Sequence, residues 1–416
     1  MDHPTNHDPL PPSTSPHLHL AHPTPEELVH ISTNTFSSWH DTLPLPDYLA
    51  ESLYLSTVPL AKDNGLTTWI LVDSRLPPNA RPILSSCESY RKRALTSDAD
   101  GGNVSDDALV HGVASVFCAP QFRRRGYAAR LMKELARVLR DWQTEDQQIK
   151  CVGSILYSDI GKTFYANLGW SPHPRNTHVA FAPQQRIPQP SSPLKAKAIA
   201  EEDLAALCEE DEAMVRKAMA RPAPGVERMR VTIVPDCDHM LWHLAKETFA
   251  TKRLFGKVPR AKGAIAGGAQ GRRVWAIWTH RYYSHPDAVA TSPESNDENV
   301  LYILRLVVEG DESADGIVWD DQKEKGKGEE EEEEEQARSL KAVLQAAQAE
   351  AAEWRLDRVV MWNPSPWVRR VITQGGLEHA VVEREEDAIA SGLWYDENGG
   401  AGPAPLWMNN EHYAWC

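Results

Sequence analysis

One stretch constrains the fold more than any other, because it alternates two kinds of hydrophobic pattern. Residues 108–117 are mostly apolar and rich in β-branched side chains, which predicts a buried strand. Residues 129–142 place apolar side chains at helical spacing, which predicts an amphipathic helix. A second apolar run at 149–156 and a short helix at 161–170 that ends at a glycine follow. The pattern predicts a strand–helix–strand–helix unit with a basic turn before its first helix.

That basic turn has the composition of an anion-binding site. Arg123, Arg124 and Arg125 precede Gly126 and Ala128. The start of a helix leaves backbone N–H groups without partners, and the helix dipole adds partial positive charge there. Because Gly126 and Ala128 lack bulk, a ligand can approach the backbone closely. The turn therefore predicts a pyrophosphate site.

Two motifs in this stretch carry a family resemblance. Arg123-x-x-Gly126-x-Ala128 resembles the cofactor signature of the GNAT superfamily of N-acetyltransferases, and residues 164–170 resemble the block that follows it. The wider chain resembles the fungal lysine acetyltransferase family through residues 86–94, 156–161 and 410–416. The resemblance implies an α/β (α+β) fold, with a mixed sheet flanked by helices. It also implies acetyl-CoA as co-substrate and no metal.

The resemblance assigns the residues around the turn to acetyl-CoA. The turn would hold the pyrophosphate, and the strand end at 116–118 would splay from its neighbour and pair with the pantetheine arm. The backbone N–H of Cys118 would then polarise the thioester carbonyl. The expected cofactor-binding residues are Val116, Phe117, Cys118, Arg123, Arg124, Arg125, Gly126, Tyr127, Ala128 and Ala129.

The same resemblance makes Tyr165 the general acid for the leaving thiolate. A phenol of pKa ~10 can protonate a thiolate whose acid has a pKa of ~8.5 only with help from its surroundings. The base that takes a proton from the amine stays open among Glu88, His111 and the terminal carboxylate of Cys416. We interpret the thiol of Cys118 as a packing group, because direct attack on a thioester needs no enzyme nucleophile.

Composition excludes several other classes of protein. The chain has no apolar run of the ~18 residues that a membrane span needs, and it lacks a signal peptide, so we expect a cytoplasmic protein. Its six cysteines are scattered, which predicts neither a disulfide framework nor a zinc site. A net charge of −15 argues against nucleic acid as a partner. Monomer and homodimer are not distinguished.

A chain of 416 residues predicts more than one domain. We expect a disordered tail at 1–15, a catalytic acetyl-CoA-binding domain at 16–182 and a proline-rich linker at 183–195. A second domain would cover 196–416, with a disordered acidic insertion at 311–335.

The second domain echoes the first. Residues 337–354, 357–362 and 364–373 predict a helix, a strand and a short helix, followed by two glycines. This repeats the order of the first half, but no Arg-x-x-Gly-x-Ala turn precedes it. We interpret it as a degenerate acetyltransferase-like domain that does not bind the cofactor and completes the substrate pocket.

Three smaller predictions concern strands and loops. Residues 177–181 should supply a sixth strand to the first domain. Residues 96–107 should form a polar loop, and the glycine-rich 263–271 a flexible one.

These observations favour an acetyl-CoA-dependent N-acetyltransferase that acts by direct attack, with a small-molecule amine as acceptor. The family resemblance makes that amine the ε-amine of free L-lysine, with Arg91 or Arg305 as partner of its carboxylate. Acetylation of a polyamine or a protein lysine is one alternative. The other is an acyl-CoA-binding sensor without turnover, against which Tyr165 argues, because binding alone needs no general acid.

Overall fold

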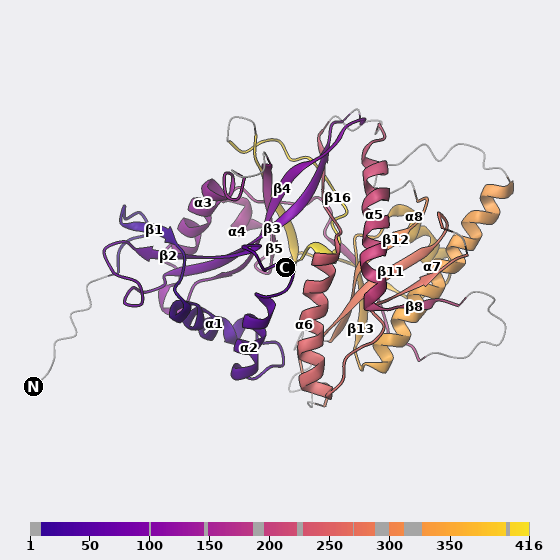
Figure 1. Cartoon of the computed structure of the whole chain (residues 1–416), viewed down its shortest axis with the longest axis horizontal. Coiled ribbons are helices and arrows are strands. Elements are labelled where there is room, and N and C mark those ends of the chain that lie inside the picture. Colours follow the sequence, from indigo (N-terminus) through magenta and orange to yellow (C-terminus); the bar gives the residue numbers. More distant parts are fainter. Residues whose placement is uncertain are drawn as a thin grey trace, which may run out of the picture.

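The chain forms two mixed sheets with helices packed on them (Figure 1), one of nine strands and one of seven. We name each sheet with its helices the first unit and the second unit. The computed structural model describes residues 10–99, 101–144, 149–185, 195–222, 228–268, 270–287, 299–311, 327–396 and 400–415.

The first half of the chain runs in the order of a strand, two helices and three strands. A capping box in which Thr24 and Glu27 exchange hydrogen bonds starts the first helix. The elements are β1 (Leu18–Ala21), α1 (Pro25–Trp39), α2 (Leu45–Leu55), β2 (Leu66–Asp73), β3 (Ser85–Ser97), β4 (Val104–Phe117), η1 (Pro120–Phe122), α3 (Tyr127–Leu139), β5 (Lys150–Ser158), α4 (Thr163–Ala166) and β6 (Ser171–Pro172).

The second half repeats this order, as the sequence predicts. Its β12–α7–β13–α8 matches β4–α3–β5–α4, and β13 is a central strand between β12 and β7. The elements are β7 (Thr177–Phe181), β8 (Lys197–Ile199), η2 (Glu201–Asp203), α5 (Leu204–Met219), β9 (Arg230–Ile233), α6 (Cys237–Phe255), β10 (Gly263–Ala266), β11 (Val274–Arg281), β12 (Val300–Val308), α7 (Lys327–Glu353), β13 (Arg358–Trp362), α8 (Pro366–Gln374), β14 (Ala380–Glu383), β15 (Ile389–Trp394), β16 (Leu406–Met408) and η4 (His412–Ala414).

Each sheet includes strands from the other half of the chain: β7 lies in the second sheet, whereas β9, β15 and β16 lie in the first. The first sheet has the order β1-β2-β3-β4-β5-β15-β6, with β9 on β3 and β16 on β9, and the second has the order β8-β10-β11-β12-β13-β7-β14. The strand β7 therefore lies antiparallel between β13 and β14, and β15 fills the matching place between β5 and β6. The prediction that residues 177–181 complete the first sheet is wrong.

This exchange changes what the domain boundary means. Each sheet contains a strand from the other half of the chain, so a division at 183–195 does not separate the two sheets. Residues 186–194 of that expected linker lie outside the described residues. A shared hydrophobic cluster, in which Ile155 of β5 joins Trp275 of β11 and Leu244 of α6, also connects the units.

Two expected loops are partly strands. The β3–β4 hairpin continues to Ser97 and Val104, because β9 pairs with the end of β3 and prolongs the sheet. The glycine-rich 263–271 begins with β10, and a Cβ on Gly263 would lie 2.2 Å from the carbonyl oxygen of Ala276. Glycine is needed there for close strand packing, not for flexibility.

Two segments expected to be disordered have structure in their described parts. In the tail, Arg130 of α3 donates to the carbonyl of Ser13 at 2.9 Å, and the Tyr127 hydroxyl donates to that of Pro11 at 2.5 Å. Residues 1–9 lie outside the described residues. The acidic run at 327–335 begins α7, since glutamate favours helices, whereas 312–326 lie outside the described residues.

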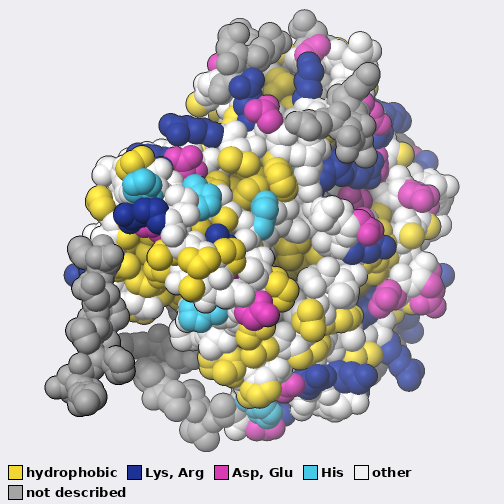
Figure 2. All heavy atoms as spheres, turned by 60° about the vertical axis from the view of Figure 1, so that its left-hand side comes forward, with side chains coloured by type: hydrophobic (Ala, Val, Ile, Leu, Met, Phe, Trp, Pro, Cys, Tyr) yellow, Lys and Arg dark blue, Asp and Glu magenta, His cyan; other side chains and the backbone are white. Residues whose placement is uncertain are grey.

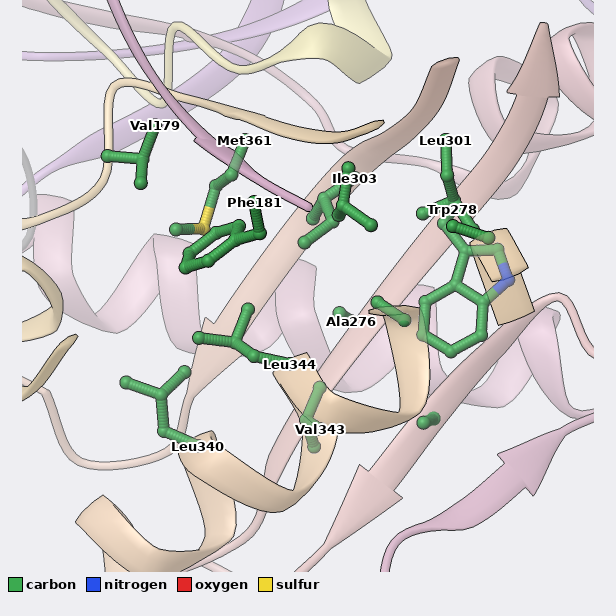
Figure 3. Packing of buried hydrophobic residues seen from close by; sticks show 14 of the residues in the cluster. Val179, Phe181, Ala276, Trp278, Leu301, Ile303, Leu340, Val343, Leu344 and Met361 are labelled. Atoms are coloured by element: carbon green, nitrogen blue, oxygen red, sulfur yellow. The ribbon is translucent and has the colours of Figure 1, made fainter. Parts of the chain in front are cut away.

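Each unit buries a core between its sheet and its helices. In the second unit, Leu340, Val343 and Leu344 of α7 pack over Ile303 and Met361 of the sheet (Figure 3). Figure 2 shows acidic and basic side chains interspersed over the described part of the face that comes forward, beside hydrophobic areas.

Candidate active site

The centre of the first sheet opens, as the sequence predicts. The parallel strands β4 and β5 pair from Ala108 and Lys150 to Val113 and Leu156. Their pairing ends there, although β4 continues to Phe117 and β5 continues to residue 158. We name this divergence the first splay. Its edges can accept an extended ligand as an added strand.

A bulge in β4 lies at the first splay. The register between β3 and β4 shifts between Ser86 and Glu88, and Ser115 adopts a positive φ of 53°. Such a conformation costs roughly 1–3 kcal/mol for a residue other than glycine. The Ser115 hydroxyl donates a hydrogen bond of 2.7 Å to Glu88 Oε2. The bulge thus connects a carboxylate on β3 to the opened strand.

Glu88 has the electrostatic environment of a proton acceptor. Burial raises the pKa of Glu88, and the hydrogen bond from Ser115 opposes that rise. A carboxylate with a raised pKa is a stronger base than one in water once it is ionised. Glu88 therefore combines a position at the first splay with a perturbed pKa, which is a pattern typical of catalytic groups.

The two other candidate bases have different outcomes. His111 is fully buried, and its Nε2 lies 3.2 Å from the carbonyl oxygen of Trp142, three residues beyond α3. Burial lowers the pKa of His111 to about 4, and it pairs with Ser154 before the strands diverge, so the structure argues against His111 as the base. Cys416 lies outside the described residues.

The C-terminal segment nevertheless reaches the first unit. The carbonyl of Ala414 accepts a hydrogen bond of 3.1 Å from Lys92 on β3. The ring of Trp415 lies 6.3 Å from that of Trp242, which in turn lies 6.0 Å from that of Tyr90. Because Tyr90 is two residues from Glu88, both side chains project from the same face of β3. The end of the described chain therefore lies on the face that bears Glu88.

Tyr165 lies on α4 and is 8% exposed. Burial raises the pKa of Tyr165, and the nearby Cys87 and Asp159 raise it further. The phenol therefore keeps its proton at neutral pH. The surroundings do not lower its pKa, as a simple proton donor would require, so we expect this phenol to act as a hydrogen-bond donor until negative charge develops on sulfur.

The basic turn has the backbone geometry that the motif predicts. Arg124 and Gly126 have positive φ angles of 60° and 81°, and α3 begins at Tyr127, so its first amides have no partner within the helix. The Arg123 side chain donates to the carbonyl of Cys118 at 2.9 Å and so ties the turn to the end of β4. All three arginines are exposed, as is Gly126.

Two residues of the expected cofactor set could reach a ligand only through their backbones. The side chain of Tyr127 is buried in the core, so only its amide can reach a ligand. The Cys118 thiol donates to the carbonyl of Leu84 at 3.3 Å, and burial raises its pKa, which agrees with a packing role.

The second unit has a matching divergence, the second splay. Its strands β12 and β13 pair only as far as Ile303 and Met361, while β12 continues to Val308. Here the C-terminal segment occupies the strand edge: the amide of Leu306 donates to Glu411 at 3.0 Å, and Arg305 also binds Glu411. The place of a pantetheine arm is thus filled by the chain itself. A cavity of about 200 Å³ remains between α5, β12 and α8.

Neither expected partner for a substrate carboxylate fits. Arg305 already binds both oxygens of Asp211 at 2.8 Å. Arg91 is three residues from Glu88 on the same strand, so it projects from the opposite face. Both predictions are wrong for reasons of pairing and geometry that the sequence does not reveal.

The family model described as "LYC1 GNAT-like C-terminal domain" matches residues 178–416. This chain belongs to that family. It is an N-acetyltransferase of the GNAT superfamily. A lysine acetyltransferase of the yeast Yarrowia lipolytica is 24% identical over 345 residues, which cover 72% of this chain and 84% of the relative.

Solved structures align over most of the chain at low identity. A GCN5-related N-acetyltransferase from Kribbella flavida is 14% identical, with a TM-score of 0.47, and covers 91% of this chain and 71% of its own. N-myristoyltransferase from Saccharomyces cerevisiae is 7% identical, with a TM-score of 0.48, and covers 95% and 84%.

The described residues contain neither a candidate membrane span nor a candidate metal cluster. None of the described helices combines the length and apolar character needed to cross a bilayer. Within the same residues, no group of three or more histidine, cysteine or acidic side chains could hold a metal ion. A cytoplasmic location remains a prediction.

Proposed function

We propose that this enzyme transfers the acetyl group of acetyl-CoA to the ε-amine of free L-lysine, by direct attack at the first splay. The observation that supports this most is the Glu88–Ser115 pair at the bulge of β4, beside the strand edge that has lost its parallel neighbour. The basic turn lies at the same end of β4, so an anchor for the donor and a base for the acceptor are close in the fold.

Each group in this arrangement has one task. The amides and arginines of the turn bind the pyrophosphate, and the free edge of β4 pairs with the pantetheine amides. The amide of Cys118 donates to the thioester oxygen as negative charge develops on it.

Two proton transfers complete the reaction. Glu88 takes one proton from the ε-ammonium, and the neutral nitrogen then attacks the carbonyl carbon and forms the new C–N bond. The C–S bond breaks, and Tyr165 protonates the leaving sulfur. The second proton that the nitrogen loses returns the Tyr165 tyrosinate to the neutral phenol, and Glu88 releases its proton to solvent, so protons balance.

The C-terminal half has a supporting role in this proposal. Its second splay is occupied by Glu411, so it offers no strand edge to a second cofactor, whereas its last residues lie on the Glu88 face of the first sheet. We propose that the second unit forms one wall of the acceptor site. In this proposal, residues 183–195 connect the two halves of the chain but do not separate two independent domains.

The test is thiol release from acetyl-CoA with L-lysine, spermidine or a lysine-containing peptide as acceptor. We expect turnover with L-lysine and a large loss of kcat in Tyr165→Phe. The matched control is Tyr395→Phe, which removes a hydroxyl bonded to the carbonyl of Ala136; the Tyr395 backbone pairs with Val152, before β4 and β5 diverge. Turnover with spermidine or peptide alone would show that L-lysine is not the acceptor. Binding of acetyl-CoA without any turnover would favour the acyl-CoA-binding sensor over the enzyme.

A further inference from the structure

One buried cation in the second unit has no acidic partner among the described residues. Arg384 follows β14 and is 7% exposed. Its guanidinium lies over the ring of Trp362, 3.8 Å from the ring centroid, and its Nε donates to the carbonyl of Asn176 at 3.2 Å. The two terminal nitrogens are buried and have no hydrogen-bond partner among the residues that the structure describes.

This arrangement differs from that of two other arginines in the same half. Arg305 donates hydrogen bonds to both carboxylate oxygens of Asp211, and the Arg281 Nε lies 2.8 Å from a carboxylate oxygen of Asp41. A buried charge without a partner is unfavourable, and burial accordingly lowers the pKa of Arg384 to about 10. The side chain nevertheless stays protonated at neutral pH, so its fork of two N–H groups is unsatisfied.

The rings packed around Arg384 are aromatic. The Trp362 ring lies 4.5 Å from that of His412 and 5.6 Å from that of Tyr157. Burial lowers the pKa of His412 and brings that of His178 to about 4, and the charge of Arg384 adds to both effects, so both rings stay neutral. Glu383, the adjacent acidic residue, is exposed. A planar anion is the ligand that this fork fits.

The location connects this fork to the first splay. Tyr157 lies on β5, directly after the last residue that pairs with β4. Tyr157, Trp362 and Trp415 pack around one hydrophobic cluster. Trp415 in turn belongs with Tyr90 to the cluster on the Glu88 face of β3. A continuous aromatic wall therefore runs from Arg384 to both strands beside the reacting centre.

We propose that Arg384 binds the carboxylate of the acceptor amine through its two terminal nitrogens. This inference rests on the proposed function and adds the residue that recognises the carboxylate of the free amino acid. A polyamine has no carboxylate, and a lysine within a protein has its carboxyl group in a peptide bond. Arg384 thus selects against both alternatives.

The test compares acceptors that differ only in the carboxylate. L-lysine, L-lysinamide and 1,5-diaminopentane are assayed with wild type, Arg384→Gln and Arg384→Lys. A charge-assisted bidentate pair contributes enough that its loss should raise KM for L-lysine about 10- to 100-fold in Arg384→Gln. We expect little change in kcat, an intermediate KM in Arg384→Lys, and an unchanged KM for 1,5-diaminopentane.

The outcomes separate this inference from the proposed function. If wild type acetylates no amine, the proposed function fails. If wild type acetylates L-lysine but Arg384→Gln changes KM for all three amines alike, Arg384 has a structural role and this inference alone fails.

A second measurement covers the case in which the variant does not fold. The second measurement is inhibition of wild-type turnover of L-lysine by L-norleucine and by n-hexylamine. We expect competitive inhibition against L-lysine by norleucine and much weaker inhibition by hexylamine, whereas equal inhibition by both would overturn the assignment.

Discussion

The hydrogen bond between Ser115 and Glu88 makes the proposed base directly testable. Ser115→Ala removes the hydroxyl that donates to Glu88 Oε2 at 2.7 Å. A hydrogen bond to a charged group contributes about 1.5–3 kcal/mol, and 1.36 kcal/mol corresponds to a tenfold change in an ionisation equilibrium. Burial already raises the pKa of Glu88, and Ser115 opposes this, so the variant should raise the pKa further.

The sign of the pH effect follows from the role of Glu88. The base must be ionised to act, so the acid limb of kcat/KM against pH should move to higher pH in Ser115→Ala. At a pH on that limb, activity should fall roughly tenfold or more, and it should recover as the pH rises. Glu88→Gln should lack this limb and stay weakly active throughout.

The matched control lies on the same strand. Ser89 projects from the face of β3 opposite to Glu88, and Ser89→Ala removes a hydroxyl that accepts a 2.8 Å hydrogen bond from the Trp69 ring N–H of β2. It should change stability without moving the acid limb. If the pH profile of Ser115→Ala overlays that of wild type while both proteins are folded, Glu88 is not the base, and the terminal carboxylate becomes the leading candidate.

Three further predictions concern stability. Gly153→Ala would place a methyl group 2.6 Å from the Trp394 ring of the exchanged strand, so calorimetry should show a lower Tm in one transition that includes both units. Arg81 lowers the pKa of Glu27 from 4.5 to about 2, so the pair stabilises the fold above pH 4.5 and loses this as the pH falls towards 2. Glu27→Gln should cost about 2–3 kcal/mol at neutral pH in urea unfolding and much less near pH 2. Burial raises the pKa of Glu411 from 4.5 to about 7, so the folded state holds this proton more tightly than the unfolded state. The free energy of unfolding of wild type should therefore fall as the pH rises from 4.5 to 7, whereas that of Glu411→Gln should not show this loss.

Local chemistry explains what the sequence could predict. The turn before α3 and the helix that ends before Gly169 each depend on residues within one or two turns of each other. The echo of the first half in the second was visible for the same reason, because the order of periodic segments is a local property. The second sheet confirms the prediction that residues 357–362 form a central strand.

Partners that are distant in sequence explain what it could not. Nothing within residues 177–181 indicates that this strand pairs with β13 and not with β5, since its alternation suits either sheet. The left-handed conformation of Ser115 follows from the register of β3 on β4. The sequence does not distinguish Arg305 from Arg384. Only the structure shows that Arg305 binds Asp211, whereas the terminal nitrogens of Arg384 have no hydrogen-bond partner among the described residues.

The most direct test of the central claim is an equilibrium titration of the full chain with CoA, because only one of the two splays should bind it. We expect one site per chain in wild type, with affinity reduced at least tenfold by Arg124→Glu combined with Arg125→Glu. Arg137→Glu with Arg140→Glu, at the other end of α3, is the charge-matched control and should keep the wild-type affinity. Two sites per chain, or one site that survives reversal of the turn's charge, would contradict the assignment of the cofactor to the first splay.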